Sequence, residues 1–545
     1  MTRSRNGADA LVRTLASAGV KRIFTLSGNH IMPVFDACLD ADIQLIHVRH
    51  EAAAVHMADA WARLTGEIGV AMVTGGPGHA NAVSALYTAQ MAEAPVLLLS
   101  GHAPNNQIGM GAFQEMQQAD VAAPLTKWSA TVASADAIAT DVGKAIRVAR
   151  SGRPGPASLG LPTDVLEAAC EPVERPQSFE PVPQALADDT AASLIRRLQQ
   201  ARRPLILTGP AAMRGAALAR ARELESACGI PVIGMESPRG VGDPSLGAFS
   251  QMLAQADCIL LLGKRLDFTL KFGKPPAIGA TCDFLQVDAD PDELERTRRA
   301  VGSRLVEWAL ADVQSGLDAL VRASAAATGW HDAWTRDVRA AIAYRPAAWR
   351  SAASTLPGRM HPVQALAPVQ QLLDSHPDSV FISDGGEIGQ WAQACLSAPA
   401  RIINGVAGAI GAALPFALAA RLARPGAPVV TVMGDGTFGF HSAEIDTAVR
   451  YKLPFVAIVG NDARWNAEYQ IQLRDYGPDR LIGCELLPAR YDAVTAAFGG
   501  FGKLVTDPRE VPAALNEAHE SGLPACLNVM IEGMPAPAIS RPDAG

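Results

Sequence analysis

The chain has 545 residues, of which 49% are hydrophobic and 19% charged, and its formal net charge is -8. This length exceeds what one compact core accommodates, so we expect two to four domains. The negative charge, and the absence of a long basic run from the sequence, argue against nucleic acid as a partner.

Targeting and crosslinking signals are weak in this sequence. The first twenty residues, MTRSRNGADALVRTLASAGV, are too polar for a signal peptide, and no apolar run reaches the roughly 18 residues of a spanning helix. The 8 cysteines are scattered and form no CxxC pair, which indicates neither a zinc site nor a disulfide framework. We therefore predict a cytoplasmic protein that does not bind membranes.

Apolar runs that end in glycine or a turn residue alternate with alanine-rich helical stretches along the chain. They include RIFTLSG, VAMVTGG, PVLLLSG, PLILTG, CILLLG, PVVTVMGDG and FVAIVGND. This alternation is typical of parallel sheets buried on both faces, and it predicts an α/β fold. A linker rich in proline and glutamate at 171–184 and a less regular stretch at 326–362 interrupt the pattern. We therefore predict three doubly wound parallel-sheet domains, at 1–170, 188–325 and 360–535.

Two stretches of the first block carry candidate functional groups. IQLIHVRHEAAAVHMADAWARLTG predicts a strand and then an amphipathic helix that begins at Glu51. A glutamate at a helix N-terminus is favourable with the helix dipole, so a structural role is the alternative for Glu51. VTGGPGHANA, at 73–82, predicts a strand end, a glycine-rich loop and the start of a helix, although GGPG by itself is only a turn.

The middle block repeats the strand, loop and helix pattern in RRPLILTGPAAMRGAALARARELE, CILLLGKRLDF and FLQVDADPDELER. Arg214 and Arg265 lie where they could meet a phosphate group, but each could equally be a surface charge. This pattern is too loose to identify a ligand.

The third block places acidic and amide side chains after two successive strands. Asp435 follows PVVTVMG, and Asn461 and Asp462 follow FVAIVG, so the two aspartates are 27 residues apart (462 − 435). Ligands of open α/β sheets bind at the carboxyl ends of parallel strands, and a carboxylate beside phosphate favours Mg²⁺. Exposed amides around Gly436 and Thr437 could hold phosphate oxygens, with the next helix expected near SAEIDTAV, at 442–449. A lone GDG is usually a structural turn, whereas GDG followed by this polar pair is more specific.

With these residues in place, the chain resembles the thiamine diphosphate (ThDP) enzymes, whose motif is GDG, about thirty residues and then NN. The resemblance implies that Asp435, Asp462 and the main-chain oxygen of Arg464 bind Mg²⁺. The chain departs from the motif because it has Asn-Asp where Asn-Asn is usual. Asp462 can still give Mg²⁺ an oxygen, and a register that uses Asn461 is the alternative.

The resemblance also assigns the rest of a cofactor site and names the three domains as pyrimidine-binding, central and diphosphate-binding. It implies that Glu51 bonds the aminopyrimidine ring and promotes removal of the thiazolium proton. It implies that the active site lies between subunits of a homodimer or homotetramer, and that the central domain holds FAD, ADP or nothing. The implied cofactor contacts are Glu51, Gly76, Pro77, His79, Ile410, Gly434, Asp435, Gly436, Thr437, Asp462 and Trp465.

Several of these contacts have a plain structural alternative. Ile410, in GVAGAIGAALP, occupies the place of the residue that bends the cofactor, but it could be ordinary core packing. Trp465 could wall the substrate pocket or be a core aromatic. His79 and His441 flank the expected site, where each could contact the cofactor or the substrate.

Other stretches narrow the resemblance. SGNHIMPVFDACLD, RHEAAAVHMADAWARL and AAPLTKWS look like benzaldehyde lyase and the acetolactate-synthase-like proteins near it, within the acetolactate synthase superfamily. GAFQEMQQ and FGFHSAEIDTAVRYKLP look like the 2-hydroxyacyl-CoA lyases and oxalyl-CoA decarboxylase. His30 and Gln114 fall where benzaldehyde lyase places its active-site His and Gln, and this implies a catalytic role for both. The alternative for His30 is a turn or capping residue. The PKDV motif of acetolactate synthase appears as PTDV, so Thr163 replaces its substrate-site lysine.

We therefore predict a ThDP- and Mg²⁺-dependent carbon–carbon lyase or carboligase that acts next to a carbonyl. The expected small-molecule substrates are acyloins, 2-hydroxyacyl compounds or 2-keto acids. The alternatives are condensation of the acetolactate synthase type and 2-hydroxyacyl-CoA cleavage. A cofactor-binding protein without activity is the least favoured alternative, because it has little need of Glu51.

Overall fold

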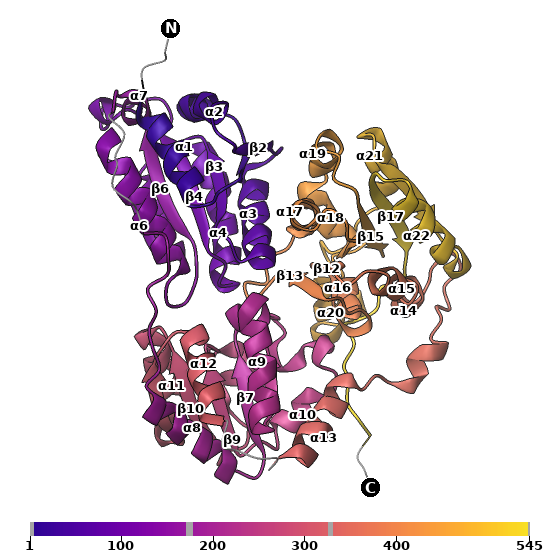
Figure 1. The fold of residues 1–545 in the computed structure, drawn as a ribbon. Coiled ribbons are helices and arrows are strands. Elements are labelled where there is room, and N and C mark those ends of the chain that lie inside the picture. The colour runs from indigo at the N-terminus through magenta and orange to yellow at the C-terminus, as the bar shows by residue number, and fades with distance from the viewer. Residues whose placement is uncertain (1–4, 171–177, 325–330, 543–545) are drawn as a thin grey trace. The chain divides into compact units, whose positions relative to one another are not determined.

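The computed structural model describes residues 5–170, 178–324 and 331–542. Residues 171–177 of the predicted linker, and the part of the 326–362 connection up to residue 330, lie outside the described residues. Three parallel sheets with helices on both sides make up the structure (Figure 1). The predicted α/β class of three doubly wound sheets is confirmed.

The N-terminal sheet has six strands in the order β2-β1-β3-β4-β6-β5, all parallel. Its strands are β1 (Arg22–Thr25), β2 (Gln44–His47), β3 (Gly69–Val73), β4 (Val96–His102), β5 (Trp128–Thr131) and β6 (Ala157–Pro162). Its main helices are α1 (Gly7–Ser17), α2 (Met32–Cys38), α3 (Glu51–Thr65), α4 (Pro77–Met91) and α6 (Ile138–Arg150).

The central sheet has five parallel strands in the order β11-β10-β9-β7-β8. Its strands are β7 (Pro204–Thr208), β8 (Val232–Gly234), β9 (Cys258–Leu262), β10 (Asp283–Asp288) and β11 (Leu305–Leu310). Its main helices are α8 (Asp188–Gln200), α9 (Gly215–Cys228), α11 (Pro291–Val301) and α12 (Val313–Ser324).

The C-terminal sheet again has six parallel strands, in the order β13-β12-β14-β15-β17-β16. Its strands are β12 (Val380–Ser383), β13 (Ala400–Ile403), β14 (Val429–Gly434), β15 (Phe455–Asn461), β16 (Phe501–Val505) and β17 (Pro524–Met530). Its main helices are α16 (Glu387–Cys395), α17 (Ala413–Ala423), α18 (Asp435–His441), α19 (Glu444–Arg450), α20 (Asn466–Asp475) and α22 (Val511–Glu520). Numbered from its own first strand, this order is the same as that of the N-terminal sheet.

Burial on both faces explains why the strands are continuous apolar runs. In β10, Leu285 and Val287 pack into one apolar cluster while Phe284 packs into another, because successive strand residues point to opposite faces. Every residue of β3, β4, β14 and β15 is buried. The pattern that predicted these strands therefore reflects helices packed on both sides.

Two compact units emerge from the contacts within the chain. The first contains the N-terminal sheet together with residues 418–423 and 446–451, and the second contains the central and C-terminal sheets. None of the helices in the described residues combines the length and apolar character that crossing a membrane requires.

Candidate functional site

Two aspartates lie at one edge of the C-terminal sheet. Asp435 follows β14 and Asp462 follows β15, and the pairing of Gly434 with Gly460 brings both strand ends to the same edge. The adjacency predicted from the strand–helix–strand spacing is confirmed. Helix α18 begins at Asp435 itself, earlier than the expected start near Ser442. The chain therefore turns into a helix directly after the strand.

Asp435 is buried with an unused acceptor. Its side chain is 1% exposed, and Oδ2 has no hydrogen-bond partner among the described residues. Burial raises the pKa of Asp435 to about 6, although hydrogen bonds from backbone amides, Gly436, Ala463 and Arg464 among them, lower it. The carboxylate thus lies against the segment that follows β15, with one oxygen left for a ligand.

Asp462 provides a second buried carboxylate, with 7% of its surface exposed. Burial is the main reason that its pKa rises to about 7, and the like charge of Asp435 raises it further. Two carboxylates close enough to repel each other in a buried setting require a cation between them or a proton on one of them.

The neighbouring Asn461 uses its amide within the fold. Its Nδ2 donates to Ala489 O and to Asn528 Oδ1, both at 3.0 Å, and its Oδ1 accepts from Ala463 N at 3.2 Å. Ala463 has a left-handed φ of 60°, and this turn carries the chain past Asp462. The geometry therefore favours Asp462 over Asn461 as the group that faces Asp435.

The residues at this edge fit a hard divalent cation. Carboxylate and main-chain oxygens are the ligands that Mg²⁺ prefers, and the unpartnered Oδ2 of Asp435 is such an oxygen. No group of three or more His, Cys, Asp or Glu side chains suited to a metal occurs among the described residues. A metal held here would therefore bind the two carboxylates and main-chain oxygen. Its remaining ligands would come from a bound cofactor or from water.

Closely packed glycines form a cradle next to this edge. A Cβ on Gly385 would lie 2.3 Å from Ile410 Cγ2, and one on Gly436 would lie 2.6 Å from Trp465 Cζ3. Ile410 and Trp465 therefore contact backbone that only glycine can provide. A cavity of about 180 Å³ opens here, and the predicted residues among those lining it are Ile410, Gly434, Gly436, Thr437, Arg464 and Trp465.

The structure adds lining residues that the sequence did not suggest. Gln390 and Asn404 line the same cavity; each is 5% exposed, and Gln390 Oε1 and Asn404 Oδ1 have no hydrogen-bond partner in the described part of the chain. Arg239, from the loop after β8, also lines it. The cavity therefore has buried polar atoms, on Gln390 and Asn404, that a polar ligand could satisfy.

Asp384 organises the glycine-rich segment before α17. Its carboxylate accepts from Gly385 N at 2.6 Å, Ala413 N at 2.8 Å and Gly411 N at 3.0 Å. Burial raises its pKa to about 6 in spite of these amides. Asp384 thereby fixes the loop that presents Ile410. His441 is also used in this loop, because its Nδ1 lies 2.8 Å from Gly411 O.

The N-terminal unit carries the second group of predicted residues. Glu51 is the first residue of α3, as predicted, and its Oε2 accepts from Asn81 Nδ2 at 3.1 Å. Its Oε1 would lie 3.4 Å from a Cβ on Gly78. Glu51 therefore lies against the start of α4, where Pro77 is the first residue.

Gln118 holds the glycine-rich loop between β3 and α4. Its Oε1 accepts from Gly76 N at 2.8 Å, and its Nε2 donates to Gly101 O at 3.0 Å. Gly76 has a φ of 57°, and a Cβ there would lie 2.9 Å from Gln114 Cβ. Sequence reasoning selected Gln114, which contacts this loop, but missed Gln118, which pins it.

His30 lies in the same region, in the turn at Asn29–Ile31. Its Nδ1 is 3.1 Å from Thr74 Oγ1, and its ring stacks on Phe113 with the centroids 6.0 Å apart. Burial lowers the pKa of His30, so the ring is neutral at neutral pH and can accept or donate a proton. Phe113 adjoins Gln114, so the structure brings His30, Gln114 and Gly76 into one neighbourhood.

His79 is fully buried, with its Nδ1 2.7 Å from Ser100 Oγ. Burial lowers its pKa to about 4, and the ring is therefore uncharged near neutral pH. This setting favours a packing role between α4 and β4, and cofactor contact by His79 stays a prediction.

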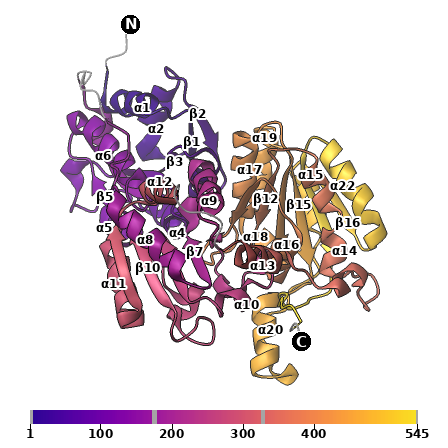
Figure 2. The ribbon, with the colours of Figure 1, turned by 60° about the horizontal axis from the view of Figure 1, so that its bottom comes forward.

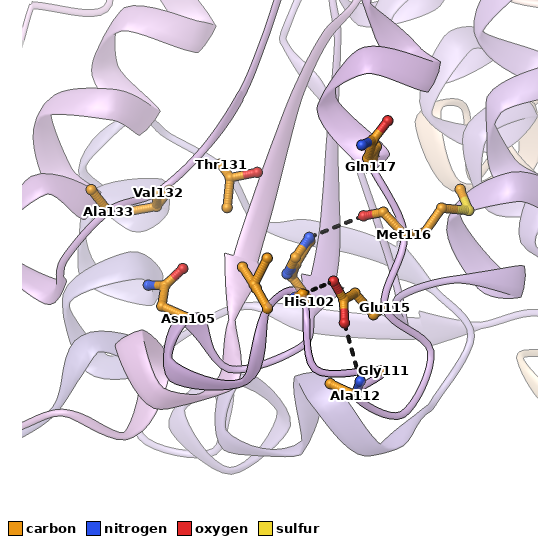
Figure 3. Close-up of a pocket in the computed structure, with 12 residues that line it drawn as sticks. His102, Asn105, Gly111, Ala112, Glu115, Met116, Gln117, Thr131, Val132 and Ala133 are labelled. Atoms are coloured by element: carbon orange, nitrogen blue, oxygen red, sulfur yellow. Dashed lines mark hydrogen bonds between the residues drawn. The ribbon is translucent and has the colours of Figure 1, made fainter.

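A larger cavity, of about 820 Å³, lies beneath the loop after β4 (Figure 3). Glu115 shapes the loop by accepting from Gly109 N at 2.6 Å and Ala112 N at 3.1 Å, and His102 Nε2 lies 3.2 Å from Met116 O. These bonds lower the pKa of Glu115, so it is ionised. Neither lysine nor arginine is among the residues that line this cavity within the described ranges.

In the central domain, Arg265 Nε is 3.0 Å from Glu293 Oε1. Its guanidinium is therefore engaged inside the fold. Phosphate binding by Arg214 or Arg265, like the presence of FAD or ADP, stays a prediction.

The fold is an α/β fold of parallel sheets, and the C-terminal sheet carries two buried aspartates at the carboxyl edge, where such sheets bind ligands. Three family models of the thiamine pyrophosphate enzymes match this chain. They are the N-terminal TPP binding domain at residues 5–121, the central domain at 191–315 and the C-terminal TPP binding domain at 384–529. The chain belongs to the thiamine pyrophosphate enzymes.

Similar curated proteins agree with this assignment. The chain is 33% identical to the acetolactate synthase large subunit of Mycobacterium tuberculosis over 549 residues, covering 98% of this chain and 96% of that protein. It is 30% identical to the human 2-hydroxyacyl-CoA lyase 2 over 582 residues, covering 97% and 90%. It is 30% identical to the mouse 2-hydroxyacyl-CoA lyase 1 over 558 residues, covering 97% and 94%. The predicted ThDP-dependent lyase or carboligase class is confirmed.

Proposed function

We propose that the enzyme cleaves or joins a carbon–carbon bond next to a carbonyl, with uncharged acyloin-type compounds as substrates. The main structural support for the cofactor assignment is the pair of buried aspartates, Asp435 and Asp462, beside the cradle formed by Gly385 and Gly436. Bound ThDP supplies the carbanion chemistry that lets such a bond break or form.

Residues of the second unit would hold the cofactor's diphosphate and its metal. Asp435, Asp462 and the main-chain oxygen of Arg464 would bind Mg²⁺, and the amides near Gly436 and Thr437 would face the phosphate oxygens. Ile410 and Trp465 would bound the space above the cradle, because both contact glycine backbone at its walls.

Residues of the first unit would handle protons. Glu51, held by Asn81, would hydrogen-bond the pyrimidine ring of the cofactor and exchange a proton with it. His30 is neutral because it is buried, so it would take the hydroxyl proton of a 2-hydroxy ketone during cleavage and return it during ligation. Gln114 would orient the substrate from the adjoining loop.

The cavity beneath the loop after β4 supports an uncharged substrate. Its apolar walls include Ile108, Met116 and Val132, and its ionised side chain is the carboxylate of Glu115. A carboxylate or phosphate group would meet like charge there and no lysine or arginine among the described lining residues. Thr163, at the PTDV position, donates to His102 O at 3.2 Å and adds no charge.

A second candidate is a 2-hydroxyacyl-CoA or 2-keto acid substrate, which the names of the similar proteins favour. The test compares benzoin, 2-hydroxyacyl-CoA and pyruvate as substrates for the protein with ThDP and Mg²⁺, with products identified by mass spectrometry. Cleavage of benzoin with little turnover of the two anionic substrates is expected. Strong CO₂ release with acetolactate would instead identify a synthase that tolerates Thr163.

Family membership supports three further proposals on assembly, metal and central-domain cofactor, and the polar N-terminus supports one on location. We expect a homodimer or homotetramer with the active site shared by subunits, a cytoplasmic location and Mg²⁺ as the bound ion. Analytical ultracentrifugation tests the assembly. A visible absorption spectrum of the purified protein tests FAD in the central domain.

A further inference from the structure

One ion pair joins the central domain to the cofactor cradle. Arg239 lies in the loop after β8, and its Nη2 is 3.1 Å from Oε2 of Glu387. Glu387 is the first residue of α16 and follows Gly386, whose φ is 84°. Figure 2 shows α16 near α18, and a Cβ on Gly386 would lie 3.4 Å from Gly434 Cα.

The two partners differ in their surroundings. The Glu387 side chain is 8% exposed, and burial raises its pKa while Arg239 lowers it. The Arg239 side chain is 43% exposed and lines the 180 Å³ cavity together with Gly386, Gly436 and Thr437. Arg239 is therefore the charged group that compensates a buried carboxylate at the rim of the cradle.

The charge of this half-site makes such compensation necessary. Asp435, Asp462 and Glu387 are all buried carboxylates, and a diphosphate brings further negative charge to the same place. Arg464 and Arg359 carry positive charge near Asp462, whereas Arg239 is the residue paired with Glu387. A divalent cation balances the two aspartates, but Glu387 lies on a different element, at the start of α16. Without a partner, its carboxylate would repel an incoming diphosphate across a poorly solvated gap.

We propose that Arg239 is a positioning residue for the cofactor that the central domain contributes: it neutralises Glu387 and so allows the diphosphate to bind. This inference rests on the proposed ThDP site. It assigns the central domain a part in binding ThDP that needs no nucleotide of its own.

The experiment titrates ThDP into the full chain with Mg²⁺ and follows tryptophan fluorescence, confirmed by calorimetry. Arg239→Gln leaves Glu387 buried and unpaired, so we expect the Kd for ThDP to rise about 10-fold or more. Glu387→Gln removes the charge that needs compensation. The double variant Arg239→Gln/Glu387→Gln is therefore expected to bind within about 3-fold of the wild type.

Arg541→Gln is the matched control, because Arg541 pairs with Asp337 at 2.7 Å and does not line the cavity. Its Kd should equal that of the wild type. Thermal unfolding verifies that each variant is folded. If Arg239→Gln does not fold, the Kd values of Glu387→Gln and the double variant still test the inference. The two values should be equal, because the loss of Arg239 should have no effect once the carboxylate of Glu387 has been replaced by an amide.

Two results would overturn the inference. One is a wild-type Kd in Arg239→Gln, and the other is a double variant as weak as Arg239→Gln, which would mean that Arg239 contacts the cofactor directly. A wild-type protein that binds no ThDP would overturn the proposed cofactor site itself. That outcome is distinct, because it appears before any substitution.

Discussion

The N-terminal and C-terminal sheets have one strand order but differ at their carboxyl edges. Strands β14 and β15 lead into the acidic residues Asp435 and Asp462. The strands at the same positions of the N-terminal sheet are β3, which leads into Thr74, and β4, which ends at His102. The C-terminal edge carries buried carboxylates suited to a cation, whereas the N-terminal region carries the neutral imidazoles of His30 and His79 and a glycine-rich loop. One topology thus provides two platforms, and a few side chains at the strand ends decide their chemistry.

The two platforms differ most in proton transfer, which we assign to Glu51 of the N-terminal platform. Glu51→Gln removes the carboxyl group that would transfer the proton. We expect kcat to fall by about 100-fold or more, because a positioned general acid–base group contributes about 10²–10⁴-fold. Binding of ThDP and Mg²⁺ should change little, since the cation site lies on the other platform. Steady-state kinetics and a ThDP titration measure the two quantities. Unchanged turnover would remove Glu51 from the mechanism.

Asp435→Asn tests the cation platform. It removes one of two buried carboxylates, including the unpartnered Oδ2, and we expect Mn²⁺ or Mg²⁺ affinity to fall by about 100-fold. Calorimetry with Mn²⁺ measures the loss, and treatment of the wild type with EDTA should abolish turnover reversibly. The control is Asn461→Ala, which should act on stability and leave the metal ligands in place. Metal affinity that survives Asp435→Asn would contradict the site.

The buried neutral imidazole of His79 predicts that the stability of the N-terminal unit depends on pH. His79 has a pKa of about 4 in the fold against 6.5 when exposed, so the unfolded state binds more protons between these values. Stability from His79 is therefore complete above pH 6.5 and is lost as pH falls toward 4, by about 3 kcal/mol in total.

Hydrogen exchange of β4 peptides at pH 7.5 and pH 5 measures this loss. His79→Asn should flatten the pH dependence in β4 and leave β15 peptides unchanged, since they belong to the other unit. Equal pH dependence in wild type and variant would show that His79 is charged or solvated in the fold.

The smallest effect is expected for Asp462→Asn, which restores the usual residue of the family motif. An amide oxygen can still bind the metal, and the repulsion of Asp435 disappears, so we expect metal affinity to change by less than about 10-fold. Mn²⁺ titrations of the wild type and the variant measure the change in affinity. A complete loss of binding would show that the second charge is essential.

The order of residues along the chain was sufficient to predict the fold class and the candidate groups that follow strands. Strands buried on both faces must be continuous apolar runs, and each ends where a polar or glycine residue stops the run; this pattern located Glu51, Asp435 and Asp462. Spacing alone left Asn461 and Asp462 as alternatives. The hydrogen bonds of Asn461 to Ala489 and Asn528 separate them, and those partners lie 28 and 67 residues away in the chain.

The sequence did not predict the residues whose role is to hold a distant segment in place, and the tertiary structure identifies them. Asp384 holds the loop before α17, Gln118 pins Gly76 against Gly101, and Arg239 reaches Glu387 from the central domain. In sequence each is an ordinary polar residue, because its role depends on a contact with a residue at least 17 positions away. Strand periodicity is a local property that the chain displays directly, whereas such pairings exist only after the sheets have brought distant strand ends together.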